Sequence, residues 1–97
     1  MRGALVDAEA NILRHAVTAT DAAAGPAVVL QQLCAIASAM SEEIAGDRVL
    51  GIGVVLPGPL DTVNGVALAV PTLAGFVDLP IRTMLEQQWR LPVQLEN

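Results

Sequence analysis

The chain has 97 residues, a net charge of −5, a hydrophobic fraction of 54% and a mean hydropathy of +0.56. These values are typical of one packed domain, or of a piece of one, and they exclude a disordered chain. The five basic residues are all arginines scattered along the sequence, and only 2% of the residues are aromatic, so we expect no direct contact with nucleic acid.

Residues 4–6 and 12–17 have the composition of two short strands, and the turn-like residues 7–11 between them predict a β-hairpin. The N-terminus lacks the basic segment, apolar stretch and cleavage site of a signal peptide. The single histidine, His15, falls in the second strand with no obvious partner in the sequence. We expect it to be an exposed or half-buried strand residue rather than a metal ligand or catalytic base.

A helix is predicted next, after a polar, alanine-rich connection at residues 18–25. Pro26 suits its first turn, and apolar residues recur every three or four positions across residues 27–44, which gives the helix one buried face. Gly46 is well placed to end it. Cys34 is the only cysteine, which excludes an internal disulfide and a thiolate metal site, and we expect it to be a buried structural thiol.

Residues 49–56 form a continuous apolar strand, and the lack of alternation predicts a sheet that is covered on both faces. The whole apolar run, residues 49–60, is shorter than the roughly 20 residues that cross a bilayer, and two prolines interrupt it. We therefore expect a cytoplasmic protein without membrane contact. Asn64-Gly65 is a strong turn signal, and residues 66–70 follow as a short strand.

The last third of the chain is predicted to hold a loop at residues 71–77, a second helix and a last strand that starts at residues 93–95. Asp78 is expected to cap this helix, with Pro80 in its first turn. Its inner side is marked by Ile81, Met84, Leu85 and Gln88 or Trp89. The predicted order is thus ββαβ(β)αβ, an α/β fold with right-handed parallel crossovers.

The turn after the central strand, Pro57-Gly58-Pro59, is the strongest candidate for a binding site. Proline fixes φ and glycine removes the Cβ, so the turn can present bare backbone to a ligand at the end of a strand. Open α/β sheets bind small molecules at the carboxyl ends of their strands. The alternative is a rigid turn that only ends the strand.

Four segments together resemble the ROK family of bacterial sugar kinases and sugar-responsive transcriptional repressors. They are residues 49–61, the Asn64-Gly65-Val66 turn, residues 71–76 with the sequence Pro-Thr-Leu-Ala-Gly-Phe, and residues 91–97 with the sequence Leu-Pro-Val-Gln-Leu-Glu-Asn. The resemblance implies an actin-like, ribonuclease-H-like ATPase fold in which two lobes close over sugar and ATP. Residues 1–97 would be a single partial domain, the amino-terminal lobe.

The resemblance also implies that parts of the family's machinery lie outside this sequence. The family's first strand, with its Asp-x-Gly-Gly-Thr loop for ATP phosphates, would precede Met1, and the catalytic Asp would directly follow Asn97. The histidine and cysteines of a zinc site would lie further on. We therefore assign no catalytic residue, metal or cofactor to these residues, and ATP with Mg²⁺ and a structural zinc only to a longer parent protein.

A small-molecule sugar is the partner that the resemblance implies. It matches Gly58 to a glycine whose backbone approaches the sugar, with Pro59 beside it in the same loop. Asn97 matches an asparagine that hydrogen-bonds sugar hydroxyls, and an amide suits this role because it both donates and accepts. Gly58 and Asn97 should therefore share one cleft.

Three positions depart from the family's pattern. Thr72, a further candidate for sugar binding, stands where many members carry Asn, and Phe76 replaces a common Trp. Ala10 stands where a hairpin glycine is usual, so Asn11 is expected to take the position with positive φ.

Two functions from different classes fit the resemblance. Because Pro-Thr-Leu-x-Gly-Phe is closer to the regulator branch, the first is the sugar-sensing lobe of a transcriptional regulator. The alternative is the amino-terminal lobe of an ATP-dependent kinase of hexoses or N-acetyl amino sugars, inactive as this fragment. A third interpretation is a truncated α/β module without activity. The unpaired strand edges left by the absent first strand further predict a homodimer, a domain-swapped assembly or a rearranged sheet.

Overall fold

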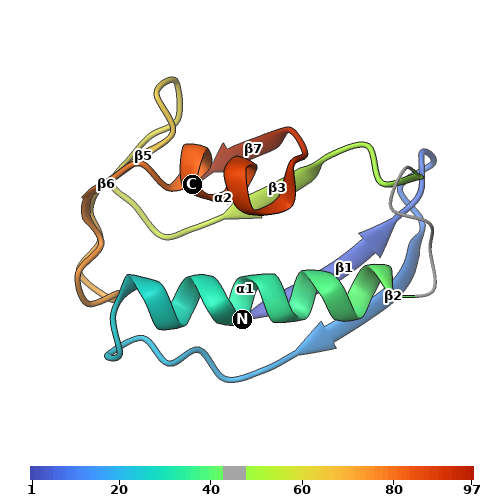
Figure 1. Ribbon diagram of the computed structural model, residues 1–97, viewed down its shortest axis with the longest axis horizontal. Coiled ribbons are helices and arrows are strands. Elements are labelled where there is room, and N and C mark those ends of the chain that lie inside the picture. Colours follow the sequence, from blue (N-terminus) through green and yellow to red (C-terminus); the bar gives the residue numbers. More distant parts are fainter. Residues whose placement is uncertain (43–47) are drawn as a thin grey trace.

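A computed structural model describes residues 1–42 and 48–97, and it shows a mixed α/β fold (Figure 1). The strands of the described residues form three sheets: the antiparallel pair β1–β2, the parallel pair β3–β7 and the antiparallel sheet β4–β5–β6. In chain order the elements are β1 (Arg2–Val6), β2 (Ile12–Val17), α1 (Pro26–Ser41), β3 (Ile52–Val55), β4 (Leu60–Asp61), β5 (Val66–Ala69), β6 (Val77–Leu79), α2 (Ile81–Trp89) and β7 (Val93–Glu96).

The predicted hairpin is present, and its turn is held by the Asp7 side chain. Asp7 Oδ1 accepts hydrogen bonds from the backbone nitrogens of Glu9 and Asn11, at 3.0 and 2.9 Å. The bond from Asn11 is the main cause that holds the pKa of Asp7 below its usual value. The expectation for the left-handed residue is wrong, because Ala10 has a φ of 65°. His15 is exposed in β2, as predicted.

Helix α1 starts at Pro26, as its sequence predicts, after Gly25 at the N-cap. The predicted C-terminal residues Ile44 and Gly46 lie outside the described residues. Cys34 is only half-buried, whereas a fully buried thiol was expected. Even so, burial raises the pKa of its thiol, and the nearby Trp89 acts in the opposite direction with a smaller effect.

Strand β3 differs from its prediction in length and in environment. It begins at Ile52 rather than Val49, and it pairs in parallel with β7. Val54 is buried, but the side chain of Val55 is 74% exposed, so the expected cover on both faces is wrong. The physical reason is that only one face of the β3–β7 pair is covered, so alternate residues point toward the core and toward solvent.

The predicted order is also corrected by two short strands, β4 and β6, on either side of β5. Strand β6 replaces the end of the predicted loop and the expected helix cap. Asp78 lies within β6 with a φ of 48° and does not cap α2, whose N-cap is Pro80. Pairing of Val77 with Ala69 holds this segment extended, and this contact with β5 overrides the local capping signal.

The core lies between α1, α2 and the strands β3, β5 and β7. Figure 1 shows α1 beneath α2 and the β3–β7 pair, with the β1–β2 hairpin packed on α1. The largest fully buried side chains are Phe76, Ile81, Leu85, Leu95 and Val29. This core fixes where β3 and β7 end, and therefore where the candidate site lies.

Candidate functional site

The carboxyl ends of the parallel strands β3 and β7 lie side by side at one edge of their sheet. Val55 is paired with Glu96, and one residue further the nitrogen of Leu56 donates to the carbonyl oxygen of Glu96 at 3.0 Å. Parallel strands bring their carboxyl ends to the same edge of a sheet. The Pro57-Gly58-Pro59 turn and Asn97 therefore start from neighbouring points.

Gly58 and Asn97 lie in direct contact beyond this last hydrogen bond. A Cβ atom at position 58 would lie 2.7 Å from Nδ2 and 3.1 Å from Oδ1 of Asn97, which is too close for a side chain. A side chain at position 58 would therefore push the amide of Asn97 away, and glycine lets this amide lie against the turn. Gly58 is half-buried and Asn97 is exposed, so the amide reaches solvent while the turn supports it.

Pro59 continues the turn through a cis Gly58–Pro59 peptide bond. Its side chain is exposed, and its carbonyl oxygen accepts a hydrogen bond of 3.1 Å from the nitrogen of Leu68 in β5. The turn is thereby joined at one side to β7 and at the other to the β4–β5–β6 sheet.

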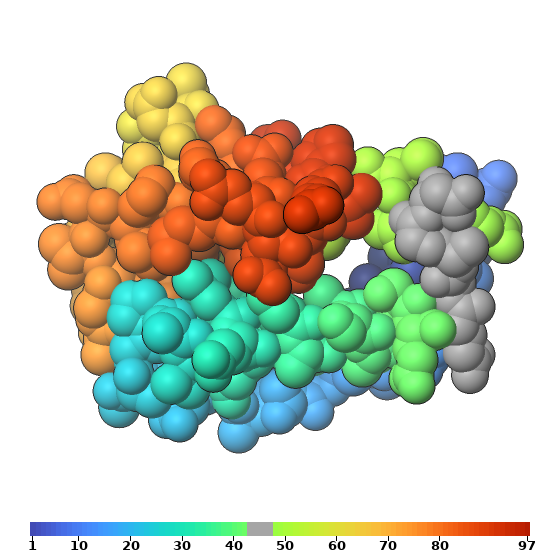
Figure 2. Space-filling view, viewed as in Figure 1, coloured from blue at the N-terminus to red at the C-terminus, as the bar shows by residue number. Residues whose placement is uncertain are grey.

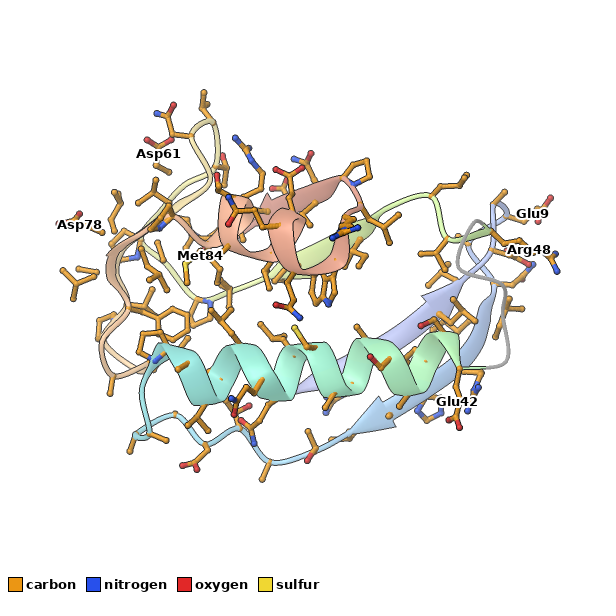
Figure 3. All side chains as sticks on the ribbon, in the orientation of Figure 1. Glu9, Glu42, Arg48, Asp61, Asp78 and Met84 are labelled. Atoms are coloured by element: carbon orange, nitrogen blue, oxygen red, sulfur yellow. The ribbon has the colours of Figure 1, made fainter. Side chains whose placement is uncertain are left out.

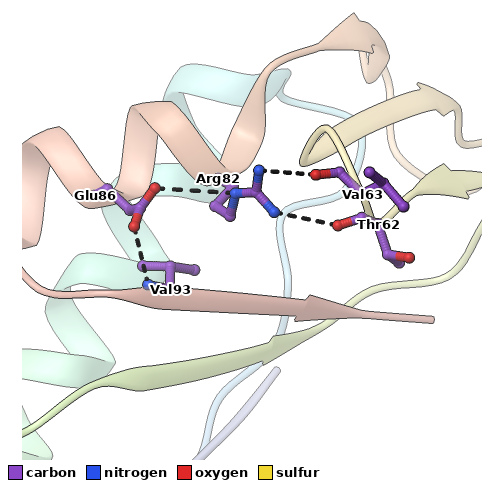
Figure 4. A network of polar contacts seen from close by, with 5 residues as sticks. All are labelled: Thr62, Val63, Arg82, Glu86 and Val93. Carbon is purple, nitrogen blue, oxygen red and sulfur yellow. Dashed lines mark hydrogen bonds and ion pairs between the residues drawn. The ribbon is translucent and has the colours of Figure 1, made fainter.

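A polar network on α2 ties these two sides together (Figure 4). The Arg82 guanidinium donates to the carbonyl oxygens of Thr62 and Val63, at 3.2 and 3.0 Å. Arg82 Nε lies 3.9 Å from Glu86 Oε1, and Glu86 Oε2 accepts a hydrogen bond of 3.3 Å from the nitrogen of Val93. Sequence reasoning missed this network, although the i,i+4 spacing of Arg82 and Glu86 was a signal for it.

The loop between β4 and β5 closes against the same helix. Asp61 accepts hydrogen bonds from the backbone and the side chain of Asn64, at 3.1 and 2.8 Å. The side-chain bond from Asn64 is the main cause that lowers the pKa of Asp61. Gly65 has a φ of 73°, and a Cβ there would lie 2.5 Å from the Cβ of Arg82, so only glycine fits.

Thr72 lies in a different part of the fold, on the loop between β5 and β6. Leu73 next to it is buried, and the nitrogen of Ala74 donates to the carbonyl oxygen of Ala22 at 2.9 Å, which anchors the loop to the segment before α1. Thr72 itself is exposed. Within residues 1–42 and 48–97, no hydrogen bond joins it to Gly58 or Asn97, so its sugar contact stays a prediction.

The charged side chains labelled in Figure 3 stand at the two ends of the molecule. Asp61 and Asp78 lie at one end, and Glu9, Glu42 and Arg48 lie at the other. No group of three or more His, Cys, Asp or Glu among the described residues could hold a metal ion. The backbone of the turn and the amide of Asn97 are themselves neutral hydrogen-bonding groups, which suit a polyhydroxylated ligand.

Among residues 1–42 and 48–97, no helix is long and apolar enough to cross a membrane.

No family model matches the chain, and no curated protein matches it significantly. Among solved structures, the crystal structure of the ROK hexokinase from Thermus thermophilus is similar, with a TM-score of 0.76 and 38% sequence identity. The similarity covers 90% of this chain and 28% of the hexokinase. The chain thus spans little more than a quarter of the hexokinase's length, and its fold resembles part of that actin-like kinase.

Proposed function

We propose that this chain is the sugar-binding lobe of an ATP-dependent sugar kinase of the ROK type. The observation that carries the proposal is the contact between Gly58 and Asn97 at the carboxyl ends of two parallel strands. The similarity to a hexokinase supports the kinase function rather than the sugar-sensing lobe of a transcriptional regulator, for which no specific support was found.

In this proposal the two residues act together on one face of the sugar. The amide of Asn97 donates from Nδ2 and accepts at Oδ1, which matches a hydroxyl group that also donates and accepts. Gly58 has no side chain, so the sugar can approach the backbone of the turn while Asn97 stays in place. Pro59 restricts the turn, which lowers the entropy lost when a ligand binds.

The residues that the structure describes offer no site that fits Mg²⁺ or zinc, and the sequence offers no phosphate loop that fits ATP. The described residues hold no cluster that could ligate a metal, and the sequence contains no Asp-x-Gly-Gly-Thr loop for phosphates. The proposal therefore assigns to this chain contacts with sugar hydroxyls only, and no step of phosphoryl transfer.

The proposal can be tested by titrating the chain with glucose, mannose and N-acetylglucosamine while recording ¹H–¹⁵N NMR spectra. We expect the backbone amide of Gly58 and the side-chain amide of Asn97 to shift together with at least one of these sugars. Asn97→Ala and Gly58→Ala should abolish the shifts. Gly53→Ala is the matched control, because a Cβ at position 53 meets nothing within 4 Å.

Shifts that avoid both residues, or that survive in Asn97→Ala, would contradict the proposal. Isothermal titration of a longer parent protein with the same sugars would then show whether sugar binds elsewhere. The titration also distinguishes hexoses from N-acetyl amino sugars, since only the latter present an acetamido group to the turn.

A further inference from the structure

The β4–β5 loop, residues 62–65, projects from the body of the molecule. Figure 2 shows its yellow atoms standing above the rest of the surface. Val63 is 82% exposed and Asn64 is also exposed, whereas Gly65 is buried against α2. Solvent therefore reaches the side-chain amide of Asn64, while the main chain that follows it is held in place.

Asn64 and Gly65 form a sequence in which an asparagine amide can react with the main chain. The carbon of an asparagine amide lies within reach of the nitrogen of the next residue, and a bond between them closes a succinimide ring. Gly65 has no side chain to hinder this approach. Among residues 1–42 and 48–97 its nitrogen donates no main-chain hydrogen bond, so no such bond has to break before it attacks.

A second asparagine in this chain has the same hydrogen bonds but a different neighbour. Asn11 donates to Asp7 from its main-chain nitrogen and from Nδ2, at 2.9 and 3.2 Å. Asn64 donates to Asp61 from the same two atoms, at 3.1 and 2.8 Å, and both asparagines are exposed. The residue after Asn11 is Ile12, whose branched Cβ crowds the nitrogen that would attack. Asn11 therefore serves as an internal control for Asn64.

We propose that Asn64 is a site of deamidation on the folded protein, and that its conversion to a carboxylate releases the β4–β5 loop. The nitrogen of Gly65 loses its proton and bonds to Cγ of Asn64, while Nδ2 takes up a proton and leaves as ammonia. Water then opens the succinimide ring. Attack of water at one carbonyl carbon gives aspartate, and attack at the other gives isoaspartate, whose main chain runs through the former side chain.

The aspartate product cannot keep the contact with Asp61. Nδ2 of Asn64 donates to Asp61 Oδ2 at 2.8 Å, and the ionised product has in its place an oxygen that only accepts. Two carboxylates then face each other, and like charges at this distance repel. Asp61 therefore pushes the modified residue away instead of fixing the turn.

The isoaspartate product also disturbs the contact with α2. Its extra methylene displaces Gly65, whose carbonyl oxygen accepts a hydrogen bond of 3.1 Å from the nitrogen of Arg82. A Cβ on Gly65 would already lie 2.5 Å from the Cβ of Arg82, so the displaced main chain has little room. Arg82 also binds the carbonyl oxygens of Thr62 and Val63, and these bonds depend on the same position of the loop.

The first test incubates the full chain at mildly alkaline pH, with circular dichroism as a check of the fold, and follows its peptides by mass spectrometry. Arg14 and Arg48 lie between the two asparagines, so cleavage after arginine separates them. We expect the mass gain of an amide-to-acid conversion at Asn64, at least about tenfold faster than at Asn11. Asn64→Gln should remove this gain, because its longer side chain does not close a succinimide ring. Equal rates at the two asparagines, or an intact amide at Asn64, overturn the proposal.

The second test measures what the product carboxylate does to the loop. Asn64→Asp places the carboxylate there without any reaction, and it should lower the melting temperature. Asp61→Asn combined with Asn64→Asp exchanges amide and carboxylate, and it should recover most of the loss because an amide again faces a carboxylate. The loss in Asn64→Asp should also shrink below about pH 4, where one protonated carboxyl donates to the other. An unchanged melting temperature in Asn64→Asp, or no recovery in the double variant, overturns the release of the loop.

Discussion

Glu86 and Arg82 lie one turn apart on α2 and hold two different segments of the chain, Glu86 the start of β7 and Arg82 the β4–β5 loop. The two side chains meet at 3.9 Å between Arg82 Nε and Glu86 Oε1. Strand β7 leads to Asn97, and the β4–β5 loop follows the turn that contains Gly58. The pair therefore connects the two sides of the candidate site through one helix.

Replacing Arg82 should destabilise the fold through its hydrogen bonds more than through its ion pair. Its two bonds to main-chain carbonyls are lost in Arg82→Ala, and we expect the free energy of unfolding to fall by about 1–3 kcal/mol. The partly exposed ion pair adds less than about 1 kcal/mol. Urea denaturation measures the change, with Gln87→Ala on the exposed side of α2 as control. Equal stability of the two variants would contradict this prediction.

Gly65→Ala should be more harmful than the same change at Gly53. Gly65 has a φ of 73° and sits against the Cβ of Arg82, whereas Gly53 faces open space. We expect Gly65→Ala to lower the free energy of unfolding by more than about 1 kcal/mol, because both the backbone conformation and the contact oppose a side chain. Thermal denaturation of the two variants compares them directly. A larger loss of stability in Gly53→Ala than in Gly65→Ala would contradict the claim that position 65 requires glycine.

Acid should weaken the β4–β5 loop through Asp61. Its pKa lies below the ordinary 3.8, so the folded state favours the ionised carboxylate. The stability gained from this preference is present above pH 3.8 and is lost as the pH falls through the lowered pKa. Asp61→Asn and Asn64→Ala should both flatten the decline of the melting temperature below pH 4. An unchanged decline in both variants would show that Asp61 is not responsible.

The 97-residue chain by itself should not phosphorylate sugar. Its candidate site brings together an amide and a glycine turn, and the sequence has no Asp-x-Gly-Gly-Thr loop for ATP phosphates. A coupled assay with ATP, Mg²⁺ and glucose should give the rate of a control without protein. ATP-dependent turnover by the purified chain above that control would contradict the prediction.

Sequence reasoning succeeded where the signal is local. The hairpin and the start of α1 at Pro26 followed from turn residues and a helix-start proline. The parallel pairing of β3 and β7 was expected from the order of strands and helices along the chain. The proximity of Gly58 and Asn97 was expected from the family resemblance, and the structure places the two residues in contact.

Prediction from the sequence failed where tertiary contacts decide the conformation. Strand β4 has two residues and β6 has three, too few for any periodic pattern, and both exist because β5 lies between them. Asp78 has the chemistry of a helix cap, yet its place in β6 rules this out. The exposure of Val55 depends on whether another part of the molecule covers its face of the β3–β7 pair, and that is not a property of the β3 sequence.

The last hydrogen bond between β3 and β7, from Leu56 to Glu96, is made by main-chain atoms alone. The side chains of Val55 and Glu96 beside it are exposed and are not needed for it. Substitutions of those two side chains can therefore accumulate without moving the corner of the fold where the turn at Gly58 meets the amide of Asn97. Proteins with quite different surfaces around this corner could share its geometry.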